Sequence, residues 1–170
     1  VWRRAGQFPA DIYHANDANT LPAAWLAAKR NRARLIYDAH ELETGRNWSA
    51  TRLASFYKLI HAWPEKIFIH HADAVITVNH SIANRLVELY HIPQPIVVDH
   101  RHTDISKIPA YWIAQAKALV VHYAHTSHGS QVVSGAYNLE DYDDFYSFAC
   151  RESDSEGLPP IETPPALRMY

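Results

Sequence analysis

Residues 11–42 contain two short apolar runs separated by a helical pattern, and this arrangement constrains the fold more than any other feature of the sequence. Ile12 and Tyr13 form the first run, and the residues LIY at 35–37 form the second. Between them, the residues LPAAWLAAK at 21–29 are apolar on every helical face and place a proline in the first turn. The pattern predicts a strand, a buried helix and a second strand.

A long helical pattern with an aromatic-rich face follows this unit. Pro64 interrupts it, and a proline inside a helix removes a hydrogen bond and kinks or ends the helix. We therefore expect two helical pieces, at about 48–62 and 64–71, with Pro64 near the first turn of the second.

The alternation of strands and helices then continues. The β-branched run at 74–78 predicts a buried parallel strand, Ser81 is expected to cap the next helix, and residues 96–98 predict a fourth strand. Strands joined by helices in strict alternation indicate right-handed crossovers and one parallel sheet. The predicted fold class is α/β, with a partial Rossmann-like parallel sheet.

Polar residues follow the first two predicted strands directly. In an open parallel sheet, ligands bind at the carboxyl ends of the strands. Carboxylates, amides and imidazoles in such a position can bind hydroxyl groups or transfer protons. The sequence therefore predicts a site composed of His14, Asn16, Asp17, Asp38, His40 and Glu41.

The pattern changes after Asp99. The polar stretch up to Pro109 is predicted to be a linker at 100–109, which separates residues 1–99 from a second small, incomplete α/β unit at 110–170. In this unit a helical pattern is followed by a new strand, ALVVHY, and the chain ends in an extended, proline-rich segment.

The turn HTSHGSQ, which follows ALVVHY, is a second candidate for chemistry. Ser127 or Ser130 could act as a nucleophile, Gly129 permits a tight turn, and amides at a helix start could hold an oxyanion. The turn faintly resembles the first block of SGNH-type esterases, but the Gly-Asp-Ser triplet and a downstream Asp-x-x-His are absent. The alternative is a polar loop without catalytic function; reactivity with a fluorophosphonate would distinguish the two.

Composition excludes several classes of function. With 16 basic and 18 acidic side chains, the formal charge of −2 gives no electrostatic footprint for nucleic acid or an anionic membrane. No apolar run approaches the length of a transmembrane segment, and the single cysteine fits a reducing cytoplasm, so we expect a cytoplasmic protein. Twelve histidines invite a metal hypothesis, but three of them cross from a strand into a turn and would not converge, so we predict no metal site.

Several segments carry a family resemblance. The residues HANDANTLPAA at 14–24 and LIYDAHEL at 35–42, followed by Glu65 and by the segment HADAVITVNHSIANRLVELYHIPQPIVV, resemble the acceptor-side half of family 4 glycosyltransferases of the GT-B fold. The resemblance covers about residues 9–99, whereas residues 100–170 do not match it. It implies that the partial sheet is half of a GT-B N-terminal domain.

The resemblance also implies roles for the predicted site. His40 would contact the acceptor or the reacting sugar of a retaining, sugar-nucleotide-dependent glycosyltransferase. Asp17 and His14 would shape the same cleft, with Asn16 and Asp38 as further acceptor-binding residues, and Glu41 would be a weaker catalytic neighbour. Glu65 matches a family glutamate, although a solvated acid favoured by the helix dipole explains it equally well.

The same resemblance implies what the complete enzyme would bind. Its partners would be a sugar nucleotide and a glycan, lipid or small-molecule acceptor, but no cofactor is expected on this chain. The family's glycine-bearing opening turn and the paired glutamates of its donor domain have no match in the sequence. We therefore expect a fragment that is inactive alone, in which the strand at 11–14 lacks neighbours on one side. A non-catalytic α/β binding module is a further hypothesis.

Overall fold

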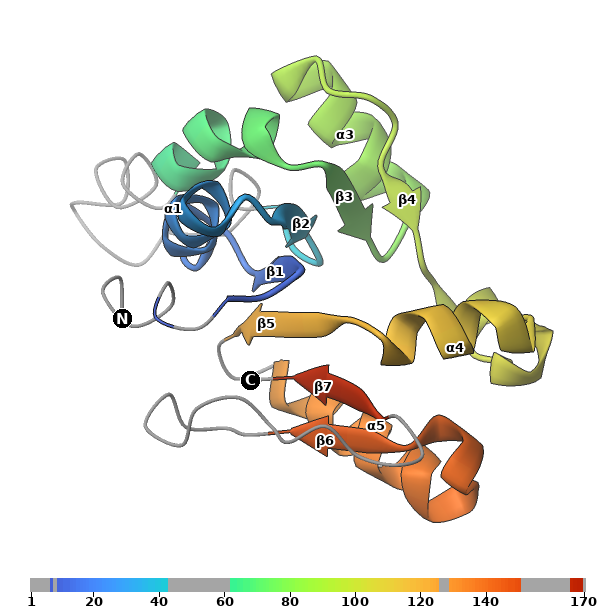
Figure 1. Ribbon diagram of the computed structural model, residues 1–170. Coiled ribbons are helices and arrows are strands. Elements are labelled where there is room, and N and C mark those ends of the chain that lie inside the picture. The colour runs from blue at the N-terminus through green and yellow to red at the C-terminus, as the bar shows by residue number, and fades with distance from the viewer. Residues whose placement is uncertain (1–6, 8, 43–61, 126–128, 151–165, 170) are drawn as a thin grey trace.

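A computed structural model describes residues 7, 9–42, 62–125, 129–150 and 166–169. In these residues, seven parallel strands form one sheet in the order β4-β3-β2-β1-β5-β7-β6 (Figure 1). The strands are β1 (Ile12–Asn16), β2 (Arg34–Asp38), β3 (Ala74–Thr77), β4 (Ile96–Val97), β5 (Val120–Ala124), β6 (Phe148–Cys150) and β7 (Leu167–Met169). The predicted α/β class with a parallel sheet is confirmed.

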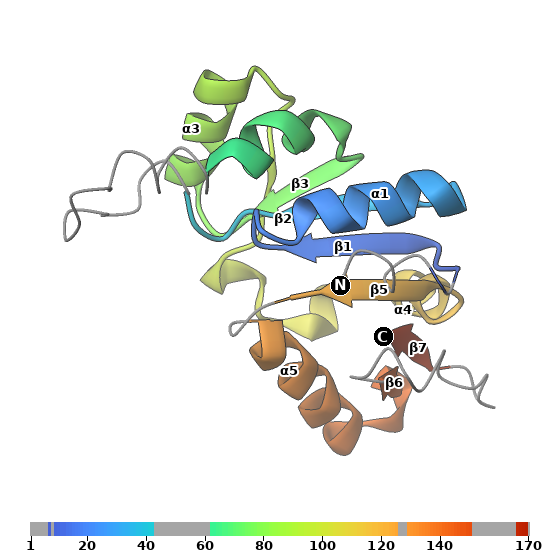
Figure 2. The same ribbon diagram turned by 90° about the vertical axis from the view of Figure 1, so that its left-hand side faces the viewer.

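Helices alternate with these strands. They are α1 (Leu21–Asn31), α3 (His80–Tyr90), α4 (Ala110–Lys117) and α5 (Gly129–Tyr142), with the short 3₁₀ turns η2 (Ile69–His71), η3 (His100–His102), η4 (Ile105–Lys107) and η5 (Asp144–Tyr146). Residues 62–68 are also helical and lead into η2. α1, residues 62–68 and α3 gather around β1 to β4, while α4 and α5 lie towards β5, β6 and β7 (Figures 1 and 2).

Two predictions about helices have different outcomes. Pro64 lies in the helical residues 62–68, as expected for the second piece, whereas most of the first piece, 48–62, lies outside the described residues. The prediction that Ser81 caps the next helix is wrong. Asn79 is the N-cap of α3, because its side-chain oxygen accepts a hydrogen bond from the backbone N–H of Ile82 at 2.9 Å.

The alternating side chains of β1 and β2 divide between the two faces of the sheet. Tyr13, Leu35 and Tyr37 are buried in a core with α1, η2 and α3. Asn31 at the end of α1 donates a hydrogen bond to the Tyr13 hydroxyl. His14 and Asp38, which alternate with these buried residues along the strands, lie on the opposite face, where they are available to a site.

Glu65 is completely buried, so the hypothesis of a solvated first-turn acid is wrong. The Tyr37 hydroxyl donates to Glu65 Oε1 at 2.8 Å, and the Tyr90 hydroxyl donates to Oε2 at 2.7 Å. These bonds link the helical residues 62–68 to β2 and α3. They satisfy the carboxylate, which would otherwise be costly to bury.

The strand β1 has neighbours on both sides, β2 and β5, so the expectation that it lacks neighbours on one side is wrong. Asp11 extends the contact with β5, since Val120 O accepts from its backbone N–H at 2.9 Å and its side chain accepts from Val120 N–H at 2.8 Å. A second buried cluster, composed of Tyr123, Val133, Phe148 and Met169, joins α5 to β5, β6 and β7. The division into 1–99, 100–109 and 110–170 stays a prediction.

The direction of chain progression reverses between β1 and β5. From β1 the chain moves through β2 and β3 to β4, and it then crosses back to β5 on the other side of β1. In open α/β sheets, ligands bind outside the carboxyl ends of the strands at such a switch point. The fold therefore directs attention to the ends of β1, β2 and β5.

Candidate functional site

Four polar side chains share one face of the sheet near the carboxyl ends of β1, β2 and β5. In the strand register, His14 lies opposite Tyr123 of β5, and Asn16 lies opposite Asp38 of β2. Because side chains two residues apart in a strand point to the same face, these four lie on one face. The structure thus brings together residues from strands far apart in the sequence.

His40 and Asp17 form the closest acid–imidazole pair of this edge. His40 Nε2 lies 3.2 Å from Asp17 Oδ1, and the two side chains are only 17% and 11% exposed. At this distance the carboxylate can orient the imidazole. A positioned imidazole is one of the groups that can transfer a proton to or from a bound hydroxyl.

The backbone holds both members of this pair in place. Asp17 has a positive φ of 83°, in a turn that Thr20 fixes by donating its hydroxyl to Asp17 O at 2.9 Å. On the other side, Ala39 N–H donates to Ile76 O at 2.8 Å, and Ala39 O accepts from the Thr77 hydroxyl at 2.8 Å. A non-glycine residue at positive φ is uncommon, and such residues concentrate at functional sites.

His14 and Asp38 form a second pair on the same edge. His14 Nε2 lies 3.8 Å from Asp38 Oδ2, and each side chain is 21% exposed. This separation suits an ion pair when the imidazole is protonated, but it is too long for a hydrogen bond. The predicted residues His14, Asp17, Asp38 and His40 therefore occupy one carboxyl edge.

Tyr123 joins this group, although the sequence analysis did not include it. Its ring packs edge-on against His14, with 5.0 Å between centroids. Burial raises the pKa of the Tyr123 hydroxyl to about 12, and the negative charges of Asp38 and Asp17 add to this effect. The hydroxyl therefore stays protonated at neutral pH and can donate a hydrogen bond.

Buried polar atoms on β1 and β5 at this edge have no hydrogen-bond partner among the described residues. They are His14 Nε2, Asn16 Nδ2 and Tyr123 Oη. Buried polar atoms are nearly always hydrogen-bonded, so atoms of this kind mark a place where a ligand or water can be bound. Three such atoms on neighbouring strands suit a ligand with several hydroxyl groups.

The other predicted residues lie around this group. Glu41 follows His40 in the chain and is partly exposed, and Ser130 is exposed in the first turn of α5. Ser127 lies outside the described residues, so its role in the hydrolase hypothesis stays untested. Gly129 packs so closely against His125 that a Cβ atom would lie 2.1 Å from the histidine Cβ, which leaves room only for glycine.

No group of three or more His, Cys, Asp or Glu residues within the described ranges is arranged to hold a metal ion. None of the helices in the part of the chain that the structure describes is long and apolar enough to cross a membrane.

Comparison with known proteins identifies the family. The family model described as Glycosyltransferase Family 4 matches residues 1–107, which is more than half of the 170-residue chain. The match includes the whole region of the resemblance and extends beyond it at both ends. A search of curated proteins gave no significant match. The four residues His14, Asp17, Asp38 and His40 all lie in the matched region, and the chain belongs to Glycosyltransferase Family 4.

Proposed function

We propose that the carboxyl ends of β1, β2 and β5 are the acceptor-binding half of the cleft of a retaining, sugar-nucleotide-dependent glycosyltransferase. The observation that supports this most directly is the contact of 3.2 Å between His40 Nε2 and Asp17 Oδ1 in a chain of this family. A glycan, a lipid or a small molecule with a hydroxyl group would be the acceptor.

In this proposal His40 is the group that exchanges a proton with the acceptor hydroxyl or the leaving group. Asp17 Oδ1 lies 3.2 Å from Nε2, so the carboxylate can orient the imidazole for this exchange. An imidazole oriented by a carboxylate is one of the side-chain groups that act as general acid or base in proteins.

The remaining residues of the edge would bind and orient the acceptor. Asn16 Nδ2, His14 Nε2 and Tyr123 Oη are buried and have hydrogen-bonding capacity unused by the described residues. Each can contact one acceptor oxygen, and several such contacts would fix which hydroxyl approaches His40. Asp38 would accept a hydrogen bond from another hydroxyl, and Glu41 would act at the margin of the site.

The sugar nucleotide is proposed as the donor of the complete enzyme, with its diphosphate held mainly by residues outside this edge. The sequence contains five glycines, none in the G-x-G-x-x-G or P-loop arrangement that cradles phosphates. We accordingly propose that the chain alone does not transfer sugar, and that it acts in the cytoplasm. For the complete enzyme, the retaining outcome can be tested by ¹H NMR, in which the signal of the anomeric proton of the first product shows the configuration of the new glycosidic bond.

Acceptor binding can be tested with the 170-residue chain itself. A panel of mono- and oligosaccharides and, separately, UDP-glucose would be titrated while amide shifts are recorded by ¹⁵N NMR. We expect a saccharide to shift amides at the ends of β1, β2 and β5. His40→Ala should weaken saccharide binding by about tenfold, which corresponds to a loss of roughly 1.4 kcal/mol in binding free energy. The matched control is His70→Ala, because His70 is exposed in η2, which follows the helical residues 62–68 and precedes β3.

Two outcomes would contradict the proposal. If UDP-glucose shifts this edge while no saccharide does, the edge holds the donor. If His40→Ala and His70→Ala change saccharide binding equally, His40 has no special position in the site.

A further inference from the structure

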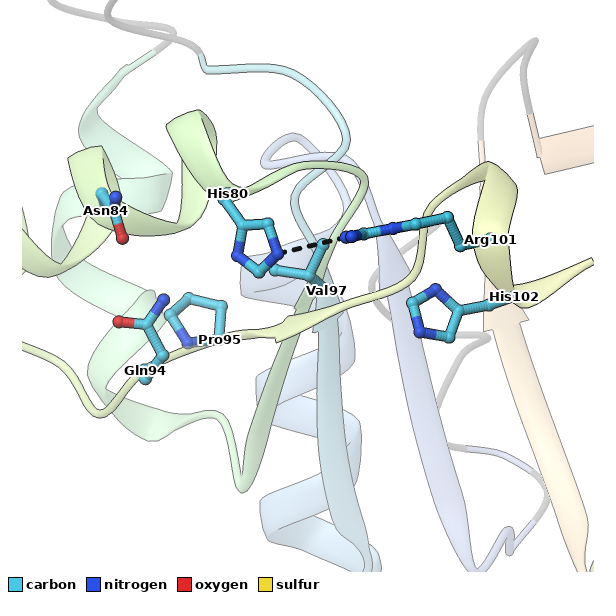
Figure 3. Close-up of a pocket in the computed structure, with 7 residues that line it drawn as sticks. All are labelled: His80, Asn84, Gln94, Pro95, Val97, Arg101 and His102. Carbon is cyan, nitrogen blue, oxygen red and sulfur yellow. Dashed lines mark hydrogen bonds between the residues drawn. The ribbon is translucent and has the colours of Figure 1, made fainter.

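A cavity lies beside β4, between α3 and η3, and none of the residues that line it belongs to the proposed acceptor site. Its volume is about 650 Å³, within the range of small-molecule sites. His80, Arg101 and His102 surround it with basic groups, and Asn84 and Gln94 add two amides (Figure 3). It is therefore large enough for a small ligand and polar enough to bind one.

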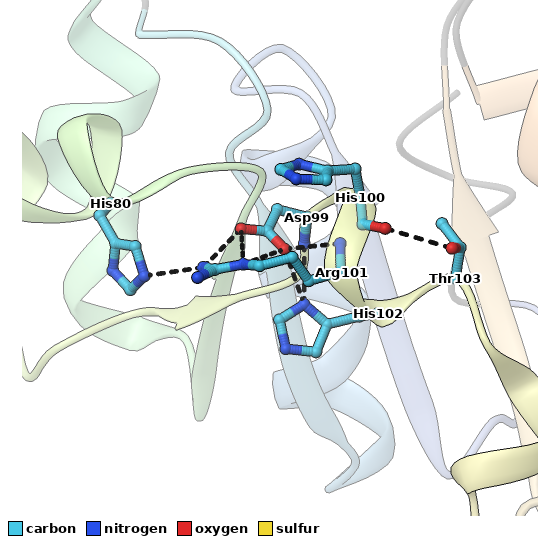
Figure 4. A network of polar contacts seen from close by, with 6 residues as sticks. All are labelled: His80, Asp99, His100, Arg101, His102 and Thr103. Carbon is cyan, nitrogen blue, oxygen red and sulfur yellow. Dashed lines mark hydrogen bonds and ion pairs between the residues drawn. The ribbon is translucent and has the colours of Figure 1, made fainter.

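The basic groups of this cavity are held by a carboxylate outside its lining. Asp99 Oδ2 accepts from Arg101 Nη2 at 2.7 Å and from Nε at 2.9 Å, and Asp99 Oδ1 lies 3.0 Å from His102 Nδ1 (Figure 4). The Asp99 side chain is 12% exposed, whereas those of Arg101 and His102 are 58% and 51% exposed. The carboxylate thus fixes one edge of each group and leaves another edge accessible.

His80 completes the arrangement from α3. Its Nε2 lies 3.3 Å from Arg101 Nη2, so the neutral imidazole can accept a hydrogen bond from the guanidinium. His80 is also the first residue of an 11-residue helix, where the helix dipole favours a negative charge. The Arg101 guanidinium and the positive end of the α3 helix dipole therefore lie at the same cavity.

The lining carries no acidic side chain. One permanent positive charge, two imidazoles and two amides line the cavity, while Asp99, which binds Arg101 and His102, is not part of the lining. Arginine and histidine donors in such an arrangement suit a phosphate or carboxylate group, because charge-assisted hydrogen bonds to oxyanions are stronger than hydrogen bonds between neutral groups. We propose that this cavity binds the phosphate or carboxylate group of a small ligand.

An anion at this site would also favour protonation of both imidazoles. Protonated His80 is repelled by Arg101, and an anion between them removes that repulsion. His102 already faces Asp99, and His100 lies in the same turn, so the groups that influence binding are His80, Asp99, His100, Arg101 and His102.

The test uses the 170-residue chain with inorganic phosphate and, separately, acetate, at constant ionic strength adjusted with sodium chloride. Amide shifts followed by ¹⁵N NMR should change at η3 and at the start of α3, and the stronger of the two anions identifies the class of ligand group. Arg101→Gln should weaken binding at least fivefold. The matched control, Arg85→Gln on the exposed side of α3, should stay within twofold, because Arg85 pairs with Glu88 outside the cavity.

A second variant separates binding from damage to the turn. His80→Gln leaves the contacts of Asp99 intact, and it should weaken phosphate or acetate binding. The proposal is wrong if Arg101→Gln and Arg85→Gln have the same effect, if glucose binds this cavity more tightly than either anion, or if the shifts spread over the lysines and arginines of the whole surface. It does not depend on the proposed glycosyl transfer, since no step of the test measures that activity.

Discussion

The buried carboxylate of Glu65 gives the sharpest test of how the fold positions the candidate site. Glu65 is fully buried and accepts hydrogen bonds from Tyr37 on β2 and Tyr90 on α3. Tyr37→Phe or Tyr90→Phe removes one donor and leaves the ring in place. A hydrogen bond to a charged group contributes about 1.5–3 kcal/mol, so each variant should lower the free energy of unfolding by roughly 2 kcal/mol.

Urea denaturation followed by tryptophan fluorescence would measure this loss. With a denaturant dependence of roughly 2 kcal/mol per molar urea, each variant should lower the unfolding midpoint by about 1 M. The two losses should not be additive, because both tyrosines contact the same carboxylate. Tyr111→Phe is the control, since Tyr111 is 62% exposed, and surface substitutions usually change stability by less than about 0.5 kcal/mol.

The reasoning would be refuted if both Tyr37→Phe and Tyr90→Phe behaved like Tyr111→Phe. In that case the carboxylate would not need its tyrosine donors, and the link from the helical residues 62–68 to β2 would have to rest on apolar packing alone. Such a result would also weaken the argument that this link positions the end of β2, from which the candidate site is built.

Other predictions follow from the same structure. In an active form of the enzyme, His40→Ala should lower turnover by roughly 10²-fold, the usual scale for a positioned acid–base group, and a loss below about threefold would assign His40 a structural role. The hydrogen bond from the Leu35 N–H and the contact with Arg34 lower the pKa of Asp73. Its stabilising effect is therefore present above about pH 4 and is lost as the pH falls further, so the urea midpoints of wild-type and Asp73→Asn should converge in acid. Because the pKa of Tyr123 is raised to about 12, wild-type protein should lose stability between about pH 10 and 12, and Tyr123→Phe should lose less. Trypsin should cut first within 99–109, and a first cut elsewhere would contradict the predicted boundary.

The strand positions were predictable because each depends on local pattern. The apolar runs around Ile12 and Ile36 are short, β-rich and ended by polar residues, and a period of two then decides which side chains share a face. The same reasoning placed His14, Asp17 and His40 at one edge, since the carboxyl ends of parallel strands meet there. The site residues on β1 and β2 therefore followed from the sequence.

The contribution of β5 could not be obtained in this way. ALVVHY was recognised as a strand, but nothing local to it indicates that β1 is its neighbour. The contact between Asp11 and Val120 joins residues 109 positions apart, and such pairing is decided by the packing of the whole sheet. Tyr123 was consequently missed, although its position at the end of an apolar run is the same signal that identified His14 and Asp38.

The burial of Glu65 was missed for a related reason. A glutamate in the first turn of a helix is usually solvated, and no local feature distinguishes one that faces a tyrosine on a strand and another on a later helix. The two hydroxyl donors come from residues 28 and 25 positions away. A buried acid of this kind is predictable only when its partners have already been placed in space.

The position of the candidate site follows from the faces of the sheet on which the helices after β1 and β5 pack. After β1, α1 packs on the face of the sheet that carries Tyr13, whereas α5 follows β5 and packs with Tyr123, on the opposite face. β1 and β5 are therefore neighbouring strands whose following helices lie on opposite faces of the sheet, and such a switch point is where open α/β sheets bind ligands. Asn16 on β1 and Tyr123 on β5 present buried polar atoms that lack hydrogen-bond partners among the described residues, so a ligand bound at this edge has these groups available together with the pair of His40 and Asp17.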